Sequence, residues 1–441
     1  MRTFAGVVVT VCIVVIATAC GGSGVSPSPS VASPTKTGPP PTLDPALHDR
    51  IPIDHIVVLM QENHSFDNYL GQLHNYDPTL DVEAEPANAS NPAPANPGGP
   101  PIAAYHETRL CETSDLNHSW NGTHLEWDNG AMDGFTKQNI SPADPSGSRA
   151  MGYYNQTDLP FYYGLFDTFA MGDRYFSSIP GPTQPNRFYL YSGTSFGHIA
   201  NGLPPSGSEF AQTTIFNLLD QAGVSWKVYS SEFPYSAFFA YVRKATGHIV
   251  PIANYYADAA AGQLPQVSFV DPVFAGAPNV ENDEHPPNNV QVGEKFVSDV
   301  INGLFTSPDW PSSALFLECD EHGGFYDHIA PPVATPPDNI APQTGPGDQS
   351  GGFDQYGIRV PVAVISPFSK QHFVSHVVHD HSSILRFIET RFGLPSLTQR
   401  DASADPMLEM FNFQNPAFVQ PPTLPEAVVD QSRLCQGGPA D

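Results

Sequence analysis

Residues 54–64 read DHIVVLMQENH, an apolar run that ends abruptly on polar side chains. Gln61, Glu62, Asn63 and His64 follow the run directly, so a carboxylate, two amides and an imidazole stand together. Near-continuous apolar runs are typical of parallel strands that are buried on both faces. In open α/β sheets, ligands bind beyond the carboxyl ends of the strands. The stretch therefore predicts a central strand that carries polar side chains to the ligand-binding edge of a sheet.

Further apolar runs predict more strands, at 224–229, 266–270, 314–319 and 359–365. Helices are predicted at 214–222, 291–304 and 382–392, the last with residues 381–383 as its cap region. Strands that alternate with helices are typical of a layered α/β fold. The chain is therefore predicted to form an α/β domain around a mostly parallel sheet.

The end of the predicted strand at 314–319 is the second place where ligand-type side chains gather. Asp320 and Glu321 follow that strand as Glu62 and Asn63 follow the first one. If both strands are central, these four side chains converge, and their oxygens suit a hard or borderline divalent cation. The alternative is that polar residues merely end each strand, which is the better interpretation of either cluster alone. The two clusters together favour a functional site.

A hydroxyl and several histidines supply further candidate chemistry. Thr183 stands between a Pro-Gly-Pro turn and a stretch that can start a helix. There it would lie at the positive end of a helix dipole, which favours its alkoxide and a phosphate group, although an ordinary N-cap threonine is the alternative. His285 lies in the proline-braced loop ENDEHPP (281–287), and His118 and His124 lie in a segment that contains tryptophans.

The charge of the chain limits its partners. The sequence has 45 Asp and Glu against 18 Lys and Arg, a net charge of −27 at pH 7. Because no basic footprint is visible, a generic nucleic-acid binder is excluded. An anionic substrate would have to be held by a local device, such as a metal ion or a helix N-terminus.

The N-terminal residues predict export. A short apolar run follows Arg2 and ends in small residues, which is typical of a secretory signal peptide over residues 1–19. ATAC followed by GGSG resembles a bacterial lipoprotein processing site and predicts a lipid on Cys20, with ordinary cleavage nearby as the alternative. Residues 20–50 are rich in Ser, Pro and Gly and predict a tether. The protein is therefore predicted to be secreted and anchored at the bacterial cell surface.

Residues 51–441 are predicted to form a single domain, with loop insertions near 83–102 and 331–352. If Cys20 is acylated, Cys111, Cys319 and Cys435 remain, so at most one disulfide forms and one thiol stays free. The sequence leaves the disulfide pairing and the oligomeric state open.

Six motifs occur together in an order that marks a family. They are QENHSFDNYLG (61–71), PGPTQPNRFYLYSGT (180–194), EHPP (284–287), DEHGGFYDH (320–328), GIRVPVAVISP (357–367) and DHSSILRFIE (380–389). Over roughly residues 51–395, the chain strongly resembles the bacterial phosphoesterase family that includes non-zinc-finger phospholipases C and secreted acid phosphatases. The resemblance implies an alkaline-phosphatase-like fold, a three-layer α/β/α sandwich with a central mostly parallel sheet.

The resemblance also implies a metal centre. Glu62 and Asn63 match the family's first pair of metal ligands, and Asp320 and Glu321 match the second acidic pair. The implied cofactor is a divalent metal ion, whose identity the sequence leaves open. Such an ion would lower the pKa of a nearby hydroxyl and screen a phosphate.

The remaining implied roles are catalytic. Thr183 matches the family's nucleophile. His285 matches a histidine that contacts the phosphoryl oxygens or the leaving group, and His118 matches another, with His124 as the competing choice. The family often has Arg where this chain has His64, so His64 is interpreted as a substrate-side or structural residue rather than a ligand.

The residues and the resemblance together predict a metal-dependent phosphoesterase that cleaves phosphate esters through a threonine, as a phosphatase or a phospholipase C. Phosphomonoester and phospholipid substrates both stay open. A phospholipase would have an apolar rim at its site, for which the aromatic candidates are 153–154, 161–163 and 233–241, unless these residues belong to the core.

Two other functions remain as alternatives. The motif GTSFG (193–197) matches the nucleophile elbow of serine esterases and would make Ser195 the nucleophile. This pattern is short and arises easily by chance. The second alternative is a non-catalytic surface binding protein on the same scaffold, and the intact set of candidate ligands argues against it.

Overall fold

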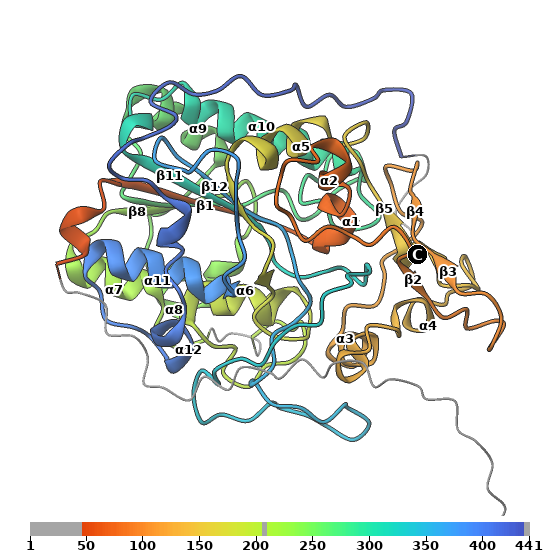
Figure 1. Cartoon of the computed structure of the whole chain (residues 1–441). Coiled ribbons are helices and arrows are strands. Elements are labelled where there is room, and N and C mark those ends of the chain that lie inside the picture. Colours follow the sequence, from red (N-terminus) through yellow and green to blue (C-terminus); the bar gives the residue numbers. More distant parts are fainter. Residues whose placement is uncertain (1–45, 205–209, 436–441) are drawn as a thin grey trace, which may run out of the picture. The chain divides into compact units, whose positions relative to one another are not determined.

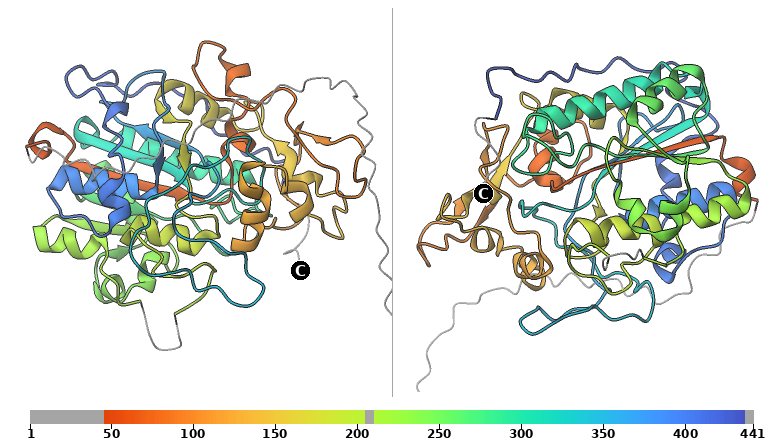
Figure 2. Two further views of the ribbon diagram at one scale, coloured as in Figure 1. Left: turned by 60° about the horizontal axis from the view of Figure 1, so that its bottom comes forward. Right: turned by 180° about the vertical axis from the view of Figure 1, so that it is seen from behind.

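Strand β1 (His55–Gln61) forms at the quoted apolar run and lies inside the largest sheet. The computed structural model describes residues 46–204 and 210–435, all within one compact unit of the chain. The predicted signal peptide (1–19) and most of the predicted tether (20–50) lie outside the described residues. Figure 1 and Figure 2 show the sheet enclosed between two layers of helices, so the predicted three-layer α/β/α sandwich is confirmed.

In the described residues the strands that follow β1 are β2 (Ser90–Asn91), β3 (Ile102–Ala103), β4 (Tyr105–His106), β5 (Gly152–Tyr153), β6 (Ala170–Gly172), β7 (Tyr175–Phe176), β8 (Trp226–Tyr229), β9 (Ile249–Val250), β10 (Val267–Val270), β11 (Ser313–Cys319), β12 (Val362–Ile365), β13 (Phe373–Ser375) and β14 (His379–Asp380). The α-helices are α1 (Phe66–Leu70), α2 (Leu73–Tyr76), α3 (Trp120–Trp127), α4 (Phe135–Gln138), α5 (Pro160–Thr168), α6 (Thr183–Ser192), α7 (Ile215–Ala222), α8 (Ala240–Lys244), α9 (Ile252–Ala261), α10 (Val290–Phe305), α11 (His381–Phe392) and α12 (Gln399–Ser403). The 3₁₀ helices are η1 (His48–Arg50), η2 (Asp128–Gly130), η3 (Ser148–Met151), η4 (Tyr235–Phe238), η5 (Trp310–Ser312) and η6 (Leu408–Met410).

The two strands that carry the candidate ligands are neighbours. Within the described residues the sheet has the order β13-β6-β12-β11-β1-β10-β8-β9, and β1 pairs in parallel with both β10 and β11. The register places Gln61 opposite Cys319, the last residues of β1 and β11. Because the two strands end at the same level, Glu62 and Asp320 leave the sheet side by side.

One predicted strand runs against the expected direction. The run at 359–365 was expected among the parallel strands, but β12 pairs antiparallel with both β11 and β6. Ser366 therefore leaves the sheet at the opposite edge, where its Oγ donates to the carbonyl of Ser313, 2.8 Å away at the start of β11. A strand that is buried on both faces reads as an apolar run in either direction, so its sequence does not reveal its direction.

Alternate side chains of β1 enter the two cores. Ile56, Val58 and Met60 pack into the core under α6, α7 and α11, whereas Val57 and Leu59 pack into the core under α5, α9 and α10. A fully buried side chain of this size contributes about 1.5–3 kcal/mol relative to an exposed one. Burial on both faces thus fixes the position of β1, and with it the position of the residues that follow.

Local signals set the helix ends. The predicted cap region of α11 (381–383) is shifted by one residue, because Asp380 is the N-cap and forms a capping box with Ser383. Aspartate and serine both cap helices well, so the sequence alone offers two candidates. Gly193 ends α6 with a φ of +69°, a conformation that glycine adopts at little cost.

The described residues contain one disulfide and no helix that could span a membrane. Cys111 and Cys435 form a disulfide, and Cys319 is free and buried, as expected for at most one disulfide among these three cysteines. Within residues 46–204 and 210–435, no helix combines the length and the apolar character needed to cross a membrane.

Candidate active site

The residues at the ends of β1 and β11 form one buried cluster. Glu62, Asn63, Asp320 and Glu321 are all nearly inaccessible to solvent. The backbone N–H of Asn63 donates to Asp320 Oδ1 at 3.2 Å, and Asn63 adopts a positive φ of 64°. The backbone of Gly323 packs tightly against that of Asn63. A Cβ at this glycine would lie 2.0 Å from the carbonyl oxygen of Asn63. The sequence thus predicted correctly that the two strand ends converge.

The oxygens of this cluster suit a divalent cation. Asn63 Oδ1 and Glu321 Oε1 are buried without a hydrogen-bond partner among the described residues. Glu62 Oε1 also lacks a hydrogen bond there, although it forms an ion pair. Asp320 is more fully engaged, because Oδ1 accepts from two backbone N–H groups and Oδ2 accepts from an arginine. Buried oxygens without partners are costly, and hard or borderline divalent cations bind such carboxylate and amide oxygens. The donor set therefore fits the cation that the resemblance implies.

Arg187 is the main residue that the sequence analysis missed. It is fully buried on α6, with Nη2 3.0 Å from Glu62 Oε1 and Nε 3.2 Å from Asp320 Oδ2. Its guanidinium lies over the rings of Tyr235 and Phe274, at 5.1 and 5.0 Å from their centroids. This arginine fixes the first turns of α6 against both strand ends.

Thr183 occupies the first turn of the same helix. The N-cap of α6 is Pro182, and no side chain caps this helix. Thr183 is therefore the first helical residue rather than the N-cap threonine of the alternative interpretation. It precedes Arg187 by four residues, and residues at this spacing lie on the same helix face. The spacing itself was visible in the motif PTQPNR (182–187) and was the available signal for Arg187.

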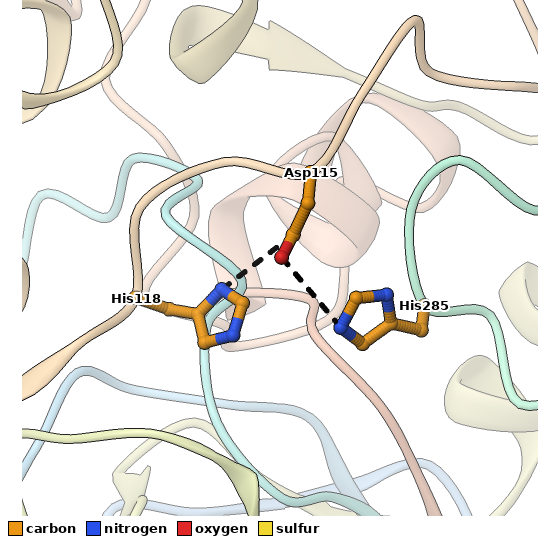
Figure 3. A group of neighbouring side chains, drawn as sticks. All are labelled: Asp115, His118 and His285. Atoms are coloured by element: carbon orange, nitrogen blue, oxygen red, sulfur yellow. Dashed lines mark ion pairs between the residues drawn. The ribbon is translucent and has the colours of Figure 1, made fainter. Parts of the chain in front are cut away.

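Two of the candidate histidines meet at an aspartate, as Figure 3 shows. Asp115 lies 3.6 Å from His118 Nδ1 and 3.8 Å from His285 Nε2. His118 also extends to the strand ends, with Nε2 4.0 Å from Glu321 Oε1 and Nδ1 3.4 Å from Asn63 Nδ2. These carboxyl and imidazole groups lie close enough together that Asp115, His118 and His285 are themselves a set that could hold a metal ion.

His124, the competing choice, does not join this group. Its Nδ1 lies 2.7 Å from the carbonyl oxygen of Trp120, and its ring lies against the indole of the same residue. His64 also belongs to the structure rather than to the site. It is buried, lies 2.7 Å from Asn68 Oδ1, and stacks on Tyr69. Burial lowers the pKa of His64 to about 4, so this imidazole is neutral at physiological pH.

The surroundings of the titratable groups in the site shift their pKa values in different directions. Burial raises the pKa of Glu62 well above its usual range, and the neighbouring Arg187 only partly opposes this. Burial acts in the same direction on Glu321, but His118, His322 and a backbone N–H together bring the pKa of that carboxyl below its ordinary value. Burial would lower the pKa of His285, but the carboxylates of Asp115, Glu62 and Asp283 raise it to about 9. At neutral pH, this pKa keeps His285 protonated.

His322 contacts Glu321 and helps to fix its position. It is the second residue whose role the sequence did not reveal. Its Nε2 lies 2.8 Å from Glu126 Oε2, and its Nδ1 lies 3.4 Å from Glu321 Oε2. The backbone N–H of Gly323 also donates to Glu321 Oε2. The second oxygen of Glu321 is thereby held in place, which leaves Oε1 directed at His118. The two histidines in DEHGGFYDH were visible in the sequence, but their partners were not.

A cavity of about 450 Å³ adjoins Asp115 and His118. It is lined by Asp115, Leu116, Asn117, His118, Ser119, Trp120, Asn121, Pro182, Ile199, Ala200, Asn201, Gln343 and Asp348. Gln343 and Asp348 come from the predicted loop insertion near 331–352, which therefore forms one wall of the cavity. A volume of this size accommodates a small ester group.

Most of the aromatic residues considered for a rim belong to the core. Tyr154, Phe161, Tyr162 and Tyr163 are buried in the core under α5, α9 and α10, and Phe239 is buried in the core under α6, α7 and α11. Apolar side chains at helical spacing serve a core as well as a binding surface, so the sequence alone did not separate the two.

Ser195 lacks the setting of a nucleophile elbow. That motif needs a sharp turn from a strand into a helix, whereas Ser195 follows the C-terminal end of α6. Its side chain is fully buried, and its Oγ has no hydrogen-bond partner among the described residues. The geometry therefore argues against a serine esterase.

Comparisons with known proteins show the family of the chain. The family model described as Phosphoesterase family matches residues 53–395. Non-specific phospholipase C1 from Arabidopsis thaliana is 34% identical over 404 residues, which cover 85% of this chain and 74% of that protein. Phospholipase C B from Mycobacterium tuberculosis (strain ATCC 25618 / H37Rv) is 33% identical over 424 residues, which cover 84% and 80%. A solved structure from Vibrio parahaemolyticus, described as a protein in the alkaline phosphatase superfamily, has a TM-score of 0.41 at 11% identity and covers 80% of this chain and 70% of its own.

Proposed function

This chain belongs to the Phosphoesterase family and is a hydrolase of phosphoric ester bonds, and we propose that Thr183 is its nucleophile. We further propose that the divalent cation it uses is held by Glu62, Asn63, Asp320 and Glu321. The observation that carries this proposal is the set of buried, unpartnered oxygens where β1 and β11 end, beside Arg187 of α6, the helix that begins at Thr183.

The chain's own groups supply most of the chemistry. Thr183 lies at the N-terminus of a ten-residue helix, where the backbone N–H groups and the helix dipole favour negative charge. Arg187 holds Glu62 and Asp320 in position through its two ion pairs. When bound, the cation would screen the phosphate and lower the pKa of a nearby hydroxyl.

The reaction proceeds in two displacements. Thr183 Oγ1 loses its proton to water and bonds to phosphorus, while the bond from phosphorus to the ester oxygen breaks. His285, protonated at neutral pH, donates a proton to the departing alkoxide. Water then attacks phosphorus and returns a proton to His285, and the released Thr183 oxygen takes a proton from solvent. His118, which lines the cavity and contacts Asp115, orients the phosphoryl group.

The relatives favour a phospholipid substrate over a phosphomonoester. Both curated relatives described above are phospholipases C by name. The polar and carboxylate lining of the cavity, which includes Asp115, Asn117 and Asp348, suits a polar ester group rather than an acyl chain. We infer that the chain acts outside the cytoplasm and is anchored through a lipid on Cys20, as the first twenty residues predict.

A substrate panel on chelated and metal-reloaded enzyme tests the proposal. The substrates are an aryl phosphate, a bis-aryl phosphate, phosphatidylcholine and sphingomyelin. Chelation should abolish turnover and reloading should restore it. The ratio of kcat/KM between phosphatidylcholine and the aryl phosphate then separates a phospholipase from a phosphatase.

Three variants assign the nucleophile. Thr183→Ala should lower turnover by at least about 1,000-fold, and Thr183→Ser should retain part of it. Ser195→Ala is the matched control, because Ser195 is an equally buried hydroxyl shortly after the same helix. Full activity of Thr183→Ala together with loss in Ser195→Ala would reverse the assignment. Binding of lipid and metal without any turnover would instead favour the surface binding protein.

A further inference from the structure

A further cluster of metal-ligand side chains lies outside the site at the ends of β1 and β11 (the strand-end site). It consists of His379, Asp405 and Glu409. Each offers one ligand atom, and the three atoms lie within 4.8 Å of one another. His379 belongs to the short strand β14, whereas Asp405 and Glu409 belong to the segment after α12. The His379 side chain is 0% exposed, and those of Asp405 and Glu409 are 43% and 28% exposed. The cluster is thus closed on the imidazole side and open on the carboxylate side.

The imidazole of His379 lacks the hydrogen bonds that buried histidines normally form. Neither of its ring nitrogens has a hydrogen-bond partner among the described residues. His322 and His381 are buried to a similar extent, and each has a ring nitrogen 2.8 Å from its carboxylate. His379 Nε2 lies farther from its carboxylates, 3.2 Å from Glu409 Oε1 and 3.5 Å from Asp405 Oδ1. A buried imidazole that lies this close to two carboxylates without a well-aligned hydrogen bond to either one leaves room for a further partner.

The two distances from His379 Nε2 to the carboxylates match a shared cation. Ligand bonds to zinc are 2.0–2.2 Å for imidazole nitrogen and carboxylate oxygen, so two ligands of a tetrahedral ion lie about 3.4 Å apart. The two measured separations, 3.2 and 3.5 Å, fall on either side of that value. One imidazole and two carboxylates also suit a borderline divalent cation better than a hard one such as Mg²⁺.

Both carboxylates are already held by a second partner. Ser375 Oγ donates to Glu409 Oε1 at 2.6 Å, and the backbone N–H of Met407 donates to Asp405 Oδ1 at 2.9 Å. Such outer hydrogen bonds orient metal-binding carboxylates in proteins. A cavity of about 570 Å³, lined in part by Ser375, His376 and Glu409, leads to the same carboxylate and leaves room for a water ligand.

We propose that His379 Nε2, Asp405 Oδ1 and Glu409 Oε1 bind a divalent transition-metal cation of the zinc class. Two carboxylates and a neutral imidazole carry a charge of −2, which such a cation balances. The bound ion would join the segment after α12 to β14 and so stabilise the C-terminal part of the fold. The competing explanation is an imidazolium held between two carboxylates. Burial would lower the pKa of His379, but without a cation Asp405 and Glu409 raise it to about 9.

Zinc binding to the full chain distinguishes the two explanations. The protein is stripped with a chelator, equilibrated with Zn²⁺, freed of excess ion, and analysed for bound zinc per chain. The same measurement is made on Asp320→Asn, which weakens the strand-end site. We expect Asp320→Asn to retain one zinc per chain, with a rise in thermal midpoint on zinc addition. Zinc content that vanishes in Asp320→Asn would overturn the proposal.

Variants of the cluster itself assign the ligands. Glu409→Gln keeps the size of a partly exposed side chain and should weaken zinc binding in the Asp320→Asn background by at least 100-fold. His379→Gln should do the same, and Glu409→Gln keeps the test valid if that buried variant does not fold. Asp167→Asn is the matched control, because Asp77, Asp167 and His372 form a similar group whose histidine is 34% exposed.

Comparison of Glu409→Gln with the control Asp167→Asn also shows which result would refute the proposed zinc site. Equal zinc affinity in Glu409→Gln and Asp167→Asn would leave only the ion pair of His379. Substituted Co²⁺ provides an independent readout, because a tetrahedral site with nitrogen and oxygen ligands gives intense visible absorption. Loss of that absorption in Glu409→Gln but not in Asp167→Asn would support the assignment, and its absence from the Asp320→Asn protein would contradict it.

Discussion

Arg359 and Arg187 are both fully buried between two carboxylates, but their hydrogen bonds are completed to different degrees. Arg359 Nε donates to both oxygens of Asp327, at 3.1 and 3.2 Å, and Nη2 donates to Asp67 at 2.8 Å. Its Nη1 donates to two backbone carbonyls. The second oxygen of Asp67 accepts from the backbone N–H of His328 and lies 2.6 Å from Nδ1 of that imidazole. This cluster is saturated.

The cluster around Arg187 is not saturated. Arg187 Nη1 and Glu62 Oε1 have no hydrogen-bond partner within the described part of the chain, and neither has Asn63 Oδ1. Both arginines lie inside motifs of the same family, Arg187 in 180–194 and Arg359 in 357–367, so the motifs do not separate them. The difference teaches that completed hydrogen bonds around Arg359 mark a structural cluster, whereas several unpartnered oxygens gathered beside Arg187 leave room for a ligand.

The largest effect should come from breaking the saturated cluster. Arg359→Met leaves Asp67 and Asp327 buried without their cation, which should lower the free energy of unfolding by about 3–5 kcal/mol. Urea unfolding measures this loss of stability. Arg174→Met is the control, because Arg174 pairs with Glu83 at the surface and should cost less than about 1 kcal/mol.

Arg187→Met should act on catalysis first. It removes the group that holds Glu62 and Asp320, so kcat/KM should fall by at least about 100-fold, which corresponds to about 2.7 kcal/mol. Its loss of stability should appear in chelator and recover on addition of a divalent cation, because a cation can replace the missing charge. If Arg187→Met keeps its kcat/KM, or if its stability does not respond to the cation, the comparison between the two arginines fails.

The same contrast explains what could be predicted from sequence. The strand at 54–61 and its polar end were predictable, because burial on both faces and the abrupt change of polarity are local features. The convergence of Glu62 with Asp320 followed from the parallel pairing of two such strands. Arg187 was missed because its ion pairs join residues that are more than a hundred positions apart in the chain.

Direction and partner choice were the other limits. Nothing in the apolar run of β12 distinguishes an antiparallel strand from a parallel one, so the direction of this strand was predicted wrongly. His118 was preferred over His124 only through the resemblance, and the fold separates them because His124 faces Trp120 on its own helix. Side-chain partners of this kind depend on tertiary packing, which local patterns do not contain.

A smaller effect should come from Asp115, which lies between His118 and His285. Burial opposes protonation of His285, whereas Asp115 is the foremost of the carboxylates that raise its pKa to about 9. His285 thus donates a proton below about pH 9, and the alkaline limb of kcat/KM should report its deprotonation.

Asp115→Asn should move that limb to lower pH by about one unit, because the charge next to His285 is lost. Asp348→Asn is the control, since Asp348 lines the same cavity but bonds to Asn121. The limb is recorded on the metal-reloaded enzyme with an aryl phosphate. An equal shift in both variants would assign the effect to the general charge of the cavity rather than to the contact with His285.

The smallest effect concerns Glu389, a buried carboxyl group. Its hydrogen bonds are also incomplete, but a proton rather than a cation compensates for this. Arg386 and Ser396 reach only its Oε2, and Oε1 has no partner among the described residues. Burial and the neighbouring Asp401 raise the pKa of Glu389 to about 10, so a proton rather than a metal ion satisfies it.

Because this pKa is raised in the folded state, the stability that it contributes is complete below pH 4.5 and is lost as the pH rises towards 10. Glu389→Gln cannot ionise, so between pH 5 and pH 8.5 its free energy of unfolding should fall less than that of the unmodified chain. Urea unfolding at both pH values checks this, and a divalent cation should change neither curve at this position. An equal pH dependence in the two proteins would mean that Glu389 ionises freely, and an unpartnered buried oxygen would then need a reason other than a bound proton or a bound cation.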